Sequence, residues 1–377
     1  MTKQTAGDRG ENRERGVKIT GFQTSLYRIP LPTPLSDSTH GEMTFFEVIL
    51  VKISDEAGAE GIGYTYTIGR GGAAIKSLLD LDLCEVLIGA DSTRIERIWD
   101  TMWWRLHYVG RGGIVSFAIS AVDIALWDLR GKQHQQPLWK LLGGYNREIK
   151  CYSGGIDLHL ETDDLLEKAR SNLEEGFRAI KMKVGRPDLK EDMKRVGALR
   201  DYVGPDVVLM VDANMRWSVE KALKASQALK DYDLFWLEEP IIPDDVEGHV
   251  KIAQVGQIPI ATGENLHTVY EFSRLICAGG VSFPEPDVSN CCGVTGWNRV
   301  ARLAYASNLD VTTHGIHEIH VHLLASIPNA SFLEVHGFGL ERFIKNPPKV
   351  VDGAMSPPDA PGHGVAFDWP SLEEHRV

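Results

Sequence analysis

Ionisable residues recur at a nearly constant interval through the second half of the chain. Successive members are separated by 29, 26, 26, 23, 27 and 20 residues, about one strand–helix unit each. Each lies at or near the end of a short apolar run of the kind that forms a buried strand. This regular spacing predicts one site built from the ends of successive strands. The seven residues are Lys183, Asp212, Glu238, Glu264, Asp287, His314 and Glu334.

Three of these residues are carboxylates, and together they predict a metal site. Asp212, Glu238 and Glu264 offer only oxygen atoms, which are the ligands that Mg²⁺ prefers. Three carboxylates brought together without a cation would repel one another. We therefore expect one Mg²⁺ per subunit, and the alternative is a solvated acidic rim.

Two lysines, Lys181 and Lys183, predict a general base. They are two residues apart on a predicted strand, so their side chains point to the same side. Repulsion between two ammonium groups lowers the pKa of each, and a lysine pKa of about 7–8 suits a base at neutral pH. The alternative is a pair of surface lysines on a sheet edge.

A second acid/base group is predicted from Asp287 and His314, which end consecutive predicted strands. A carboxylate that accepts a hydrogen bond from one imidazole nitrogen fixes the tautomer and raises the basicity of the other nitrogen. A histidine with a purely structural role in the core is the alternative.

A cation between two proton-transfer groups suits removal of the proton next to a carboxylate. The product of that step is an enediolate, whose added negative charge needs a cation and hydrogen-bond donors. Glu334 is expected to help as a neutral acid, which requires a raised pKa.

The elements that must position these residues follow a strand–helix rhythm from Ile149 onward. Eight short apolar runs alternate with amphipathic helical stretches, which predicts parallel βαβ units closing into a (β/α) barrel with its active site at the carboxyl ends of the strands. The predicted strands are Lys150–Gly155, Ala179–Val184, Val207–Asp212, Leu234–Glu238, Ile258–Glu264, Val281–Asp287, Asp310–His314 and Phe332–Val335.

An α+β domain is predicted before the barrel. Its expected strands form a three-stranded antiparallel meander, and three helical stretches follow. The strands are Ile19–Ile29, Phe45–Ser54 and Gly61–Thr67; the helices are Ala73–Ile88, Ser92–His107 and Ile114–Lys132; a loop is expected over Pro32–Met43. The predicted division is a disordered leader over 1–16, a capping domain over 17–142, the barrel over 143–335, and a C-terminal segment over 336–377 that packs back on the capping domain.

The composition and net charge exclude several classes of protein. Of 377 residues 43% are hydrophobic and 24% are charged, which excludes disorder over most of the chain. The formal net charge of −12 argues against nucleic acid or a membrane as partner. Five scattered cysteines favour a reducing compartment, and we expect a cytoplasmic enzyme with a small-molecule substrate.

These motifs together resemble the enolase superfamily, mandelate racemase subgroup. They are Lys181-Met182-Lys183, Val211-Asp212-Ala213-Asn214, Glu238-Glu239-Pro240, Gly263-Glu264, Pro286-Asp287, Gly293-Val294-Thr295-Gly296-Trp297 and His314. The resemblance implies an α+β capping domain on a modified (β/α)₇β barrel, a Mg²⁺ site at the three carboxylates, acid/base roles for Lys183 and the Asp287–His314 pair, and a homo-oligomer.

Within the subgroup, the chain is similar to acid-sugar dehydratases and to 3,6-anhydro-L-galactonate cycloisomerases, the latter over 107–113 and 263–268. The resemblance implies a small sugar-acid substrate and a capping domain that supplies specificity loops. The predicted substrate contacts are His40, Tyr66, Arg70 and Asn214.

Three other functions stay open. Two opposed bases also allow 1,1-proton transfer, as in a racemase or epimerase. A barrel hydrolase could use zinc and the histidines of His314–His322. A non-catalytic sugar-acid binding protein is disfavoured, because binding alone does not need two acid/base groups beside a metal.

Overall fold

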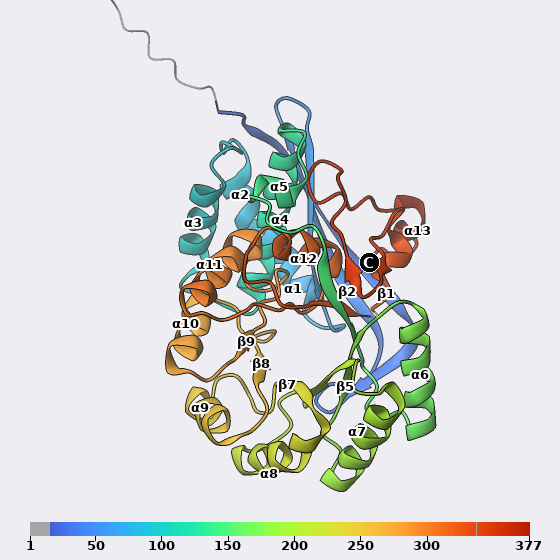
Figure 1. Cartoon of the computed structure of the whole chain (residues 1–377). Coiled ribbons are helices and arrows are strands. Elements are labelled where there is room, and N and C mark those ends of the chain that lie inside the picture. The colour runs from blue at the N-terminus through green and yellow to red at the C-terminus, as the bar shows by residue number, and fades with distance from the viewer. Residues whose placement is uncertain (1–15, 337) are drawn as a thin grey trace, which may run out of the picture.

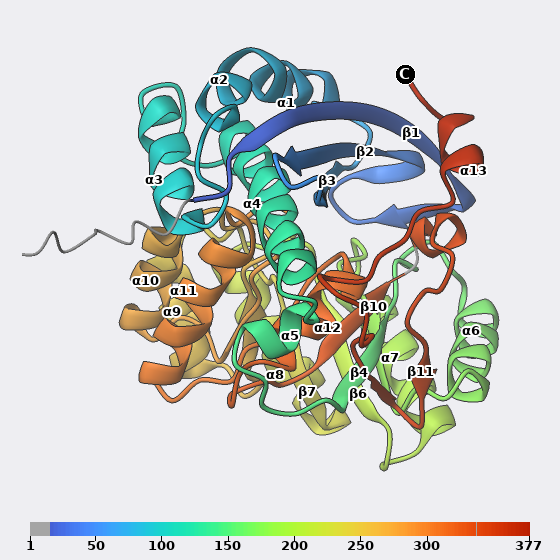
Figure 2. The ribbon, with the colours of Figure 1, turned by 90° about the horizontal axis from the view of Figure 1, so that it is seen from above.

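The computed structural model describes residues 16–336 and 338–377, which form an α+β domain seated on a curled, mostly parallel sheet (Figure 1). Figure 2 shows the meander and its helices on one side of the barrel, with α4 lying between the two parts. Apart from Gly16, the predicted leader lies outside the described residues. No described helix has the length and apolarity needed to cross a membrane.

The predicted meander is confirmed. Strands β1 (Ile19–Asp37), β2 (Gly41–Asp55) and β3 (Glu60–Thr67) pair antiparallel in that order. The predicted loop over Pro32–Met43 is wrong, because both strands continue into it and Leu35 pairs with Met43. A register shift between Pro30 and Leu35 accommodates the prolines on this edge strand, where a missing N–H does least harm.

The capping helices follow the predicted stretches, with one interruption. They are α1 (Gly72–Leu78), a π-helical turn (Leu79–Leu83), α2 (Cys84–Leu87), α3 (Ile95–Leu106) and α4 (Ile114–Gln133). Helix α4 packs on β3 where two glycines leave room for its backbone. A Cβ atom at Gly61 or Gly63 would lie 2.1 Å from the carbonyl oxygen of Ala125 or Ala121, respectively.

The barrel sheet is largely as predicted. Strands β4 to β9 pair in parallel in chain order, and β10 pairs with β4 on the other side. Their bounds are β4 (Ile149–Gly154), β5 (Ala179–Lys183), β6 (Val208–Asp212), β7 (Leu234–Glu238), β8 (Ile260–Thr262), β9 (Phe283–Pro284) and β10 (Leu333–His336). The surrounding helices are α5 (Leu138–Leu141), α6 (Thr162–Glu174), α7 (Leu189–Val203), α8 (Val219–Leu229), α9 (Val246–Val255), α10 (Val269–Ala278), α11 (Gly293–Ala306) and α12 (His317–Leu324).

The segment Asp310–His314, predicted as a strand, contains only an isolated bridge from Val311 to Ala330. Its threonines use their hydroxyls on the backbone of the neighbouring segment. Thr312 Oγ1 donates to the carbonyl of Phe332 at 2.9 Å, an arrangement that competes with a regular ladder. The chain still closes this side of the barrel, since Thr312 N donates to the Pro284 carbonyl at 3.1 Å.

No regular helix directly follows β10 in the described residues. The chain forms a 3₁₀ turn (Leu340–Phe343), a hairpin of β11 (Val350–Val351) and β12 (Ala354–Met355), and α13 (Trp369–Glu373). The last residues reach β1, where Val377 N donates to the Leu26 carbonyl at 2.9 Å. The domain limits given above stay predictions.

Candidate active site

The three predicted metal-binding carboxylates meet at the mouth of the barrel. Asp212 is the last residue of β6, Glu238 is the last residue of β7, and Glu264 follows β8. One oxygen of each lies within 4.8 Å of an oxygen of the other two. Parallel strands end at one face, so three separate βα units bring these groups together.

The donor set fits Mg²⁺. All three residues offer hard oxygen ligands. Three buried side-chain oxygens at the site have no hydrogen-bond partner among the described residues. They are Glu264 Oε2, Glu239 Oε2 and Asn214 Oδ1. Buried polar atoms are rarely left unpaired, so these oxygens suit a hydrated cation.

Burial and like charge oppose ionisation of this cluster. Burial raises the pKa of Glu238 well above its usual value, although the Lys181 ammonium lowers it. Burial also raises the pKa of Glu264, with His314 acting in the opposite direction. A divalent cation would remove this conflict by favouring the ionised forms.

Both lysines of β5 point into this cluster. Lys183 forms an ion pair with Asp212, and Lys181 forms one with Glu238. The predicted lowering of the lysine pKa values is wrong. Burial is the largest single effect and lowers the pKa of Lys183, and repulsion by Lys181 lowers it too, but the carboxylates of Asp212, Glu264 and Glu238 together raise it above its usual value.

The structure brings the predicted pair Asp287 and His314 together. His314 Nδ1 lies 3.1 Å from Asp287 Oδ2, and Nε2 lies 3.5 Å from Glu264 Oε2. Burial lowers the pKa of His314, but the carboxylates of Glu264 and Glu334 and the bond to Asp287 raise it to about 10. One nitrogen is thus oriented by Asp287 while the other faces the carboxylates.

The expectation that Glu334 is a neutral acid is contradicted. Glu334 Oε1 lies 2.8 Å from Lys181 Nζ, and Glu334 Oε2 accepts a hydrogen bond from Gly315 N at 3.1 Å. Burial raises the pKa of this carboxyl. The positive charges of Lys181 and His314 lower it, and their combined effect outweighs burial, so the pKa lies well below the ordinary value. Glu334 therefore holds Lys181 in place as its ion-pair partner.

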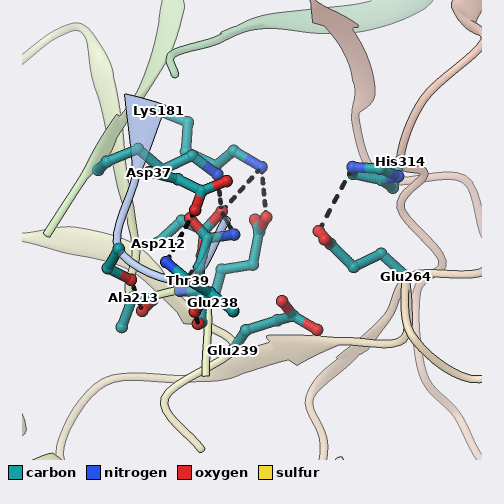
Figure 3. Close-up of polar contacts among 12 residues, drawn as sticks. Asp37, Thr39, Lys181, Asp212, Ala213, Glu238, Glu239, Glu264 and His314 are labelled. Atoms are coloured by element: carbon teal, nitrogen blue, oxygen red, sulfur yellow. Dashed lines mark hydrogen bonds and ion pairs between the residues drawn. The ribbon is translucent and has the colours of Figure 1, made fainter. Parts of the chain in front are cut away.

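The two proton-transfer groups lie on opposite sides of the carboxylates. Figure 3 shows Lys181 on one side, His314 on the other, and Asp212, Glu238 and Glu264 in the space between. Lys183 joins the lysine side through its pair with Asp212. The arrangement can remove a proton on one side of a bound carbon and deliver a proton on the other.

A cavity of about 380 Å³ lies where the capping domain meets this site. Three predicted substrate contacts line it from the capping side: His40, Tyr66 and Arg70. Glu264, Asp287 and His314 line it from the barrel. Asn214 does not line this cavity, and its backbone N donates to Asp212 Oδ1 at 2.8 Å.

The tip of the β1–β2 hairpin touches the barrel mouth. Ser38 Oγ donates to the Ala213 carbonyl at 2.9 Å, just after β6. His40 Nδ1 lies 2.8 Å from Asp37 Oδ2, and this hydrogen bond raises the pKa of His40 although burial opposes it. The tip thereby holds an imidazole at the edge of the cavity.

Several residues in the site escaped prediction. Asn265 Nδ2 donates to Glu239 Oε1 at 2.8 Å, and both residues directly follow metal-ligand candidates in the sequence, which was an available signal. Asn290 Nδ2 donates to the Glu264 carbonyl at 2.6 Å. Asn290 is 26 residues from its partner, and no local motif marks it.

Two histidines of the predicted zinc cluster, His320 and His322, bond to the backbone instead. His320 Nε2 accepts a hydrogen bond from Val288 N at 2.9 Å. His322 Nδ1 accepts from Trp139 N at 3.3 Å, and its Nε2 lies 3.0 Å from the His363 carbonyl. These three imidazole nitrogens hold backbone segments, which disfavours the zinc hydrolase that the sequence left open.

Two family descriptions match the chain. Residues 23–143 match "Mandelate racemase / muconate lactonizing enzyme, N-terminal domain", and residues 164–371 match "Enolase C-terminal domain-like". The chain is 55% identical to a 3,6-anhydro-alpha-L-galactonate cycloisomerase of Streptomyces coelicolor, over 94% of this chain and 98% of the relative. It is 34% identical to an L-talarate/galactarate dehydratase of Salmonella typhimurium, over 94% of this chain and 89% of that protein.

Solved structures share the fold. A racemase from Streptomyces coelicolor A3(2) with bound magnesium aligns with a TM-score of 0.94 at 53% identity, covering 95% of this chain and 100% of the other. An L-talarate dehydratase from Polaromonas sp. JS666, complexed with Mg and L-glucarate, aligns with a TM-score of 0.91 at 34% identity, covering 96% and 98%.

Proposed function

The chain belongs to the mandelate racemase / muconate lactonizing enzyme family of the enolase superfamily, and from that premise we propose that it is a Mg²⁺-dependent cycloisomerase of 3,6-anhydro-galactonate. Its relatives include dehydratases and cycloisomerases of sugar acids. The reaction class is removal of the α-proton followed by β-elimination or ring opening, which makes the protein a lyase or an isomerase.

The supporting observation is the geometry of the mouth. An oxygen-only cluster of three carboxylates lies between a lysine pair and an oriented histidine, beneath a cavity shared by both domains. The closeness to the cycloisomerase, over nearly the full length of both chains, favours ring opening over dehydration.

Each residue of the site has a separate role in the proposed reaction. Asp212, Glu238 and Glu264 would hold Mg²⁺, which supplies positive charge to offset the charge that develops on the substrate carboxylate. Mg²⁺ at the Asp212 oxygens would weaken the ion pair that raises the pKa of Lys183. Lys183 in its neutral form then accepts the α-proton, and the electrons of the C–H bond form a double bond between the α-carbon and the carboxylate carbon. The enediolate electrons then form a double bond between the α- and β-carbons as the β-carbon–oxygen bond breaks, and the electron pair of that broken bond stays on the ring oxygen.

His314 donates its proton to that oxygen, with Asp287 holding the imidazole in place. The opened enol takes a proton at carbon and becomes a 2-keto acid, an isomer of the substrate. If the oxygen expelled were a free hydroxyl, the same steps would release water.

Incubation with 3,6-anhydro-L-galactonate tests the proposal. We expect the product to be a 2-keto acid with the same mass as the substrate. A dehydratase acting on galactarate would instead give a product that is lighter by one water. Incorporation of α-deuterium from D₂O without a keto product would instead show 1,1-proton transfer. Lys183→Ala and His314→Ala should each abolish turnover, with the exposed Lys224→Ala and His134→Ala as controls. Near-wild-type turnover in both site variants would contradict the proposal.

We also propose that the protein works in the cytoplasm, as its scattered cysteines indicate, and as a homo-oligomer, as the family resemblance implies. Both statements are open to direct test by fractionation and by light scattering. A small sugar acid is its expected partner, in line with the relatives.

A further inference from the structure

A tyrosine of the capping domain reaches the acid/base pair of the barrel. Tyr66 Oη donates to Asp287 Oδ2 at 3.0 Å and lies 3.3 Å from His314 Nδ1. We propose that Tyr66 is a positioning residue for the Asp287–His314 pair, so that docking of the capping domain completes the acid/base unit. The proposal rests on the proposed function for the role of that pair.

The carboxylate of Asp287 is held at both oxygens. Ser289 N donates to Oδ1 at 2.7 Å from within the barrel. Oδ2 faces both the Tyr66 hydroxyl and His314 Nδ1, which a carboxylate oxygen with two lone pairs can accommodate. Without the hydroxyl, Oδ2 would keep the imidazole as its single partner. The position of Oδ2, and through it the orientation of the imidazole, is therefore set in part by a group from the other domain.

The backbone beside His314 leaves space for this contact. Gly315 has φ of +80°, a conformation that side chains rarely adopt. A Cβ atom at Gly315 would lie 2.6 Å from both Asp287 Oδ2 and Tyr66 Oη. The residue after the histidine thus permits the hydroxyl and the carboxylate to approach from the same side.

Strand β3, which carries Tyr66, is hydrogen-bonded to the barrel at the two residues before Tyr66. Thr65 Oγ1 donates to the Ser289 carbonyl at 2.7 Å, and the Tyr64 hydroxyl donates to Glu318. Tyr66 is 7% exposed, and its ring lies 5.4 Å from that of Phe338. The Tyr66 hydroxyl is therefore held against the pair by packing. Positioning is thus a role that Tyr66 has in addition to the substrate contact expected from the sequence, since Tyr66 also lines the cavity.

Tyr66→Phe removes only the hydroxyl, and Tyr64→Phe is its matched control. Both changes delete one tyrosine–carboxylate bond between β3 and the barrel, but only the first bond reaches the pair. With 3,6-anhydro-L-galactonate, we expect kcat of Tyr66→Phe to fall about tenfold or more, while KM changes less than about twofold. Tyr64→Phe should keep kcat within about twofold of the wild type. Equal losses in the two variants, or a change in KM alone, would overturn the proposal.

A measurement without substrate separates this proposal from the proposed function. In protein labelled with ¹⁵N-histidine, the His314 signals are assigned by their absence in His314→Asn. We expect the imidazole ¹⁵N shifts of His314 to move in Tyr66→Phe and to stay in place in Tyr64→Phe. Unmoved shifts in Tyr66→Phe would overturn the positioning role. A wild type that shows no turnover of the anhydro acid, but shows the moved shifts in the variant, would instead contradict the proposed substrate alone.

Discussion

The ammonium of Lys183 forms an ion pair with Asp212, one of the three carboxylates that gather at the barrel mouth. Lys183 thus lies directly beside a group expected to bind the metal. Because like charges repel across this cluster, a bound cation stabilises the folded protein. The same cation competes with the lysine for the Asp212 oxygens.

We therefore expect Mg²⁺ to raise the thermal midpoint. A ligand at one hundred times its dissociation constant contributes about 2.7 kcal/mol to the free energy of unfolding. Asp212→Asn should remove most of this gain, because it takes a charged oxygen from the cluster. Thermal scans with Mg²⁺ and with a chelator measure the effect. Glu220→Gln, on the exposed side of α8, is the control, and a full Mg²⁺ shift retained in Asp212→Asn would contradict the assignment.

The hydrogen bond from His314 to Asp287 gives a second prediction. Asp287→Asn keeps the size of the side chain but removes the charge that orients and stabilises the protonated imidazole. We expect kcat to fall about 10²- to 10⁴-fold, with Mg²⁺ binding retained. Steady-state kinetics and calorimetric titration with Mg²⁺ measure the two effects. Asp310→Asn, at an exposed position, should leave both unchanged, and a variant at Asp287 with wild-type kcat would exclude the pair from the chemistry.

The main features of the site were predictable because strand ends repeat. Lys183, Asp212 and Glu238 are the last residues of β5, β6 and β7, as the spacing indicated. A parallel barrel converts a regular interval in sequence into one location in space. The fold class and the meeting of the three carboxylates could be inferred from the same interval.

Other features depend on contacts that the sequence does not display. Tyr66 and Asp287 are 221 residues apart, and no motif joins them. The pKa of Lys183 was mispredicted because sequence spacing showed the neighbouring lysine but not the contact with Asp212. The segment Asp310–His314 has a strand-like composition, yet the bonds of its threonine hydroxyls to neighbouring backbone limit it to one bridge.

Close packing of β3 on α4 gives a third prediction. A Cβ atom at Gly63 would lie 2.1 Å from the Ala121 carbonyl oxygen, and neither backbone can move without disturbing the sheet or the helix. We expect Gly63→Ala to lower the free energy of unfolding by about 3 kcal/mol. Gly197→Ala in α7 is a useful contrast, since its nearest neighbour is a Tyr232 ring atom at 3.2 Å and alanine favours helix. Urea unfolding compares the two variants, and equal stabilities would contradict the packing argument.

The buried carboxyl of Asp123 in α4 gives a prediction for pH. Thr295 N and Thr295 Oγ1 donate to its two oxygens at 2.8 and 2.7 Å. Burial nevertheless raises the pKa of Asp123 from 3.8 to about 7, against the lowering effect of these hydrogen bonds. Between these values the folded state keeps a proton that the unfolded chain has released, so stability falls as pH rises. Below the lower value both states are protonated, and this loss is absent.

Asp123→Asn removes the titrating group and keeps its size. A pKa difference of about 3 units corresponds to about 4 kcal/mol. We expect the stability of the wild type, relative to Asp123→Asn, to decline by up to this amount as pH rises from about 4 to about 8, and then to level off. Urea unfolding at several pH values measures this difference. Asp100→Asn on the exposed side of α3 is the control. If the relative stability of the Asp123 variant were constant with pH, the carboxyl would have to be ionised in the folded protein throughout this range.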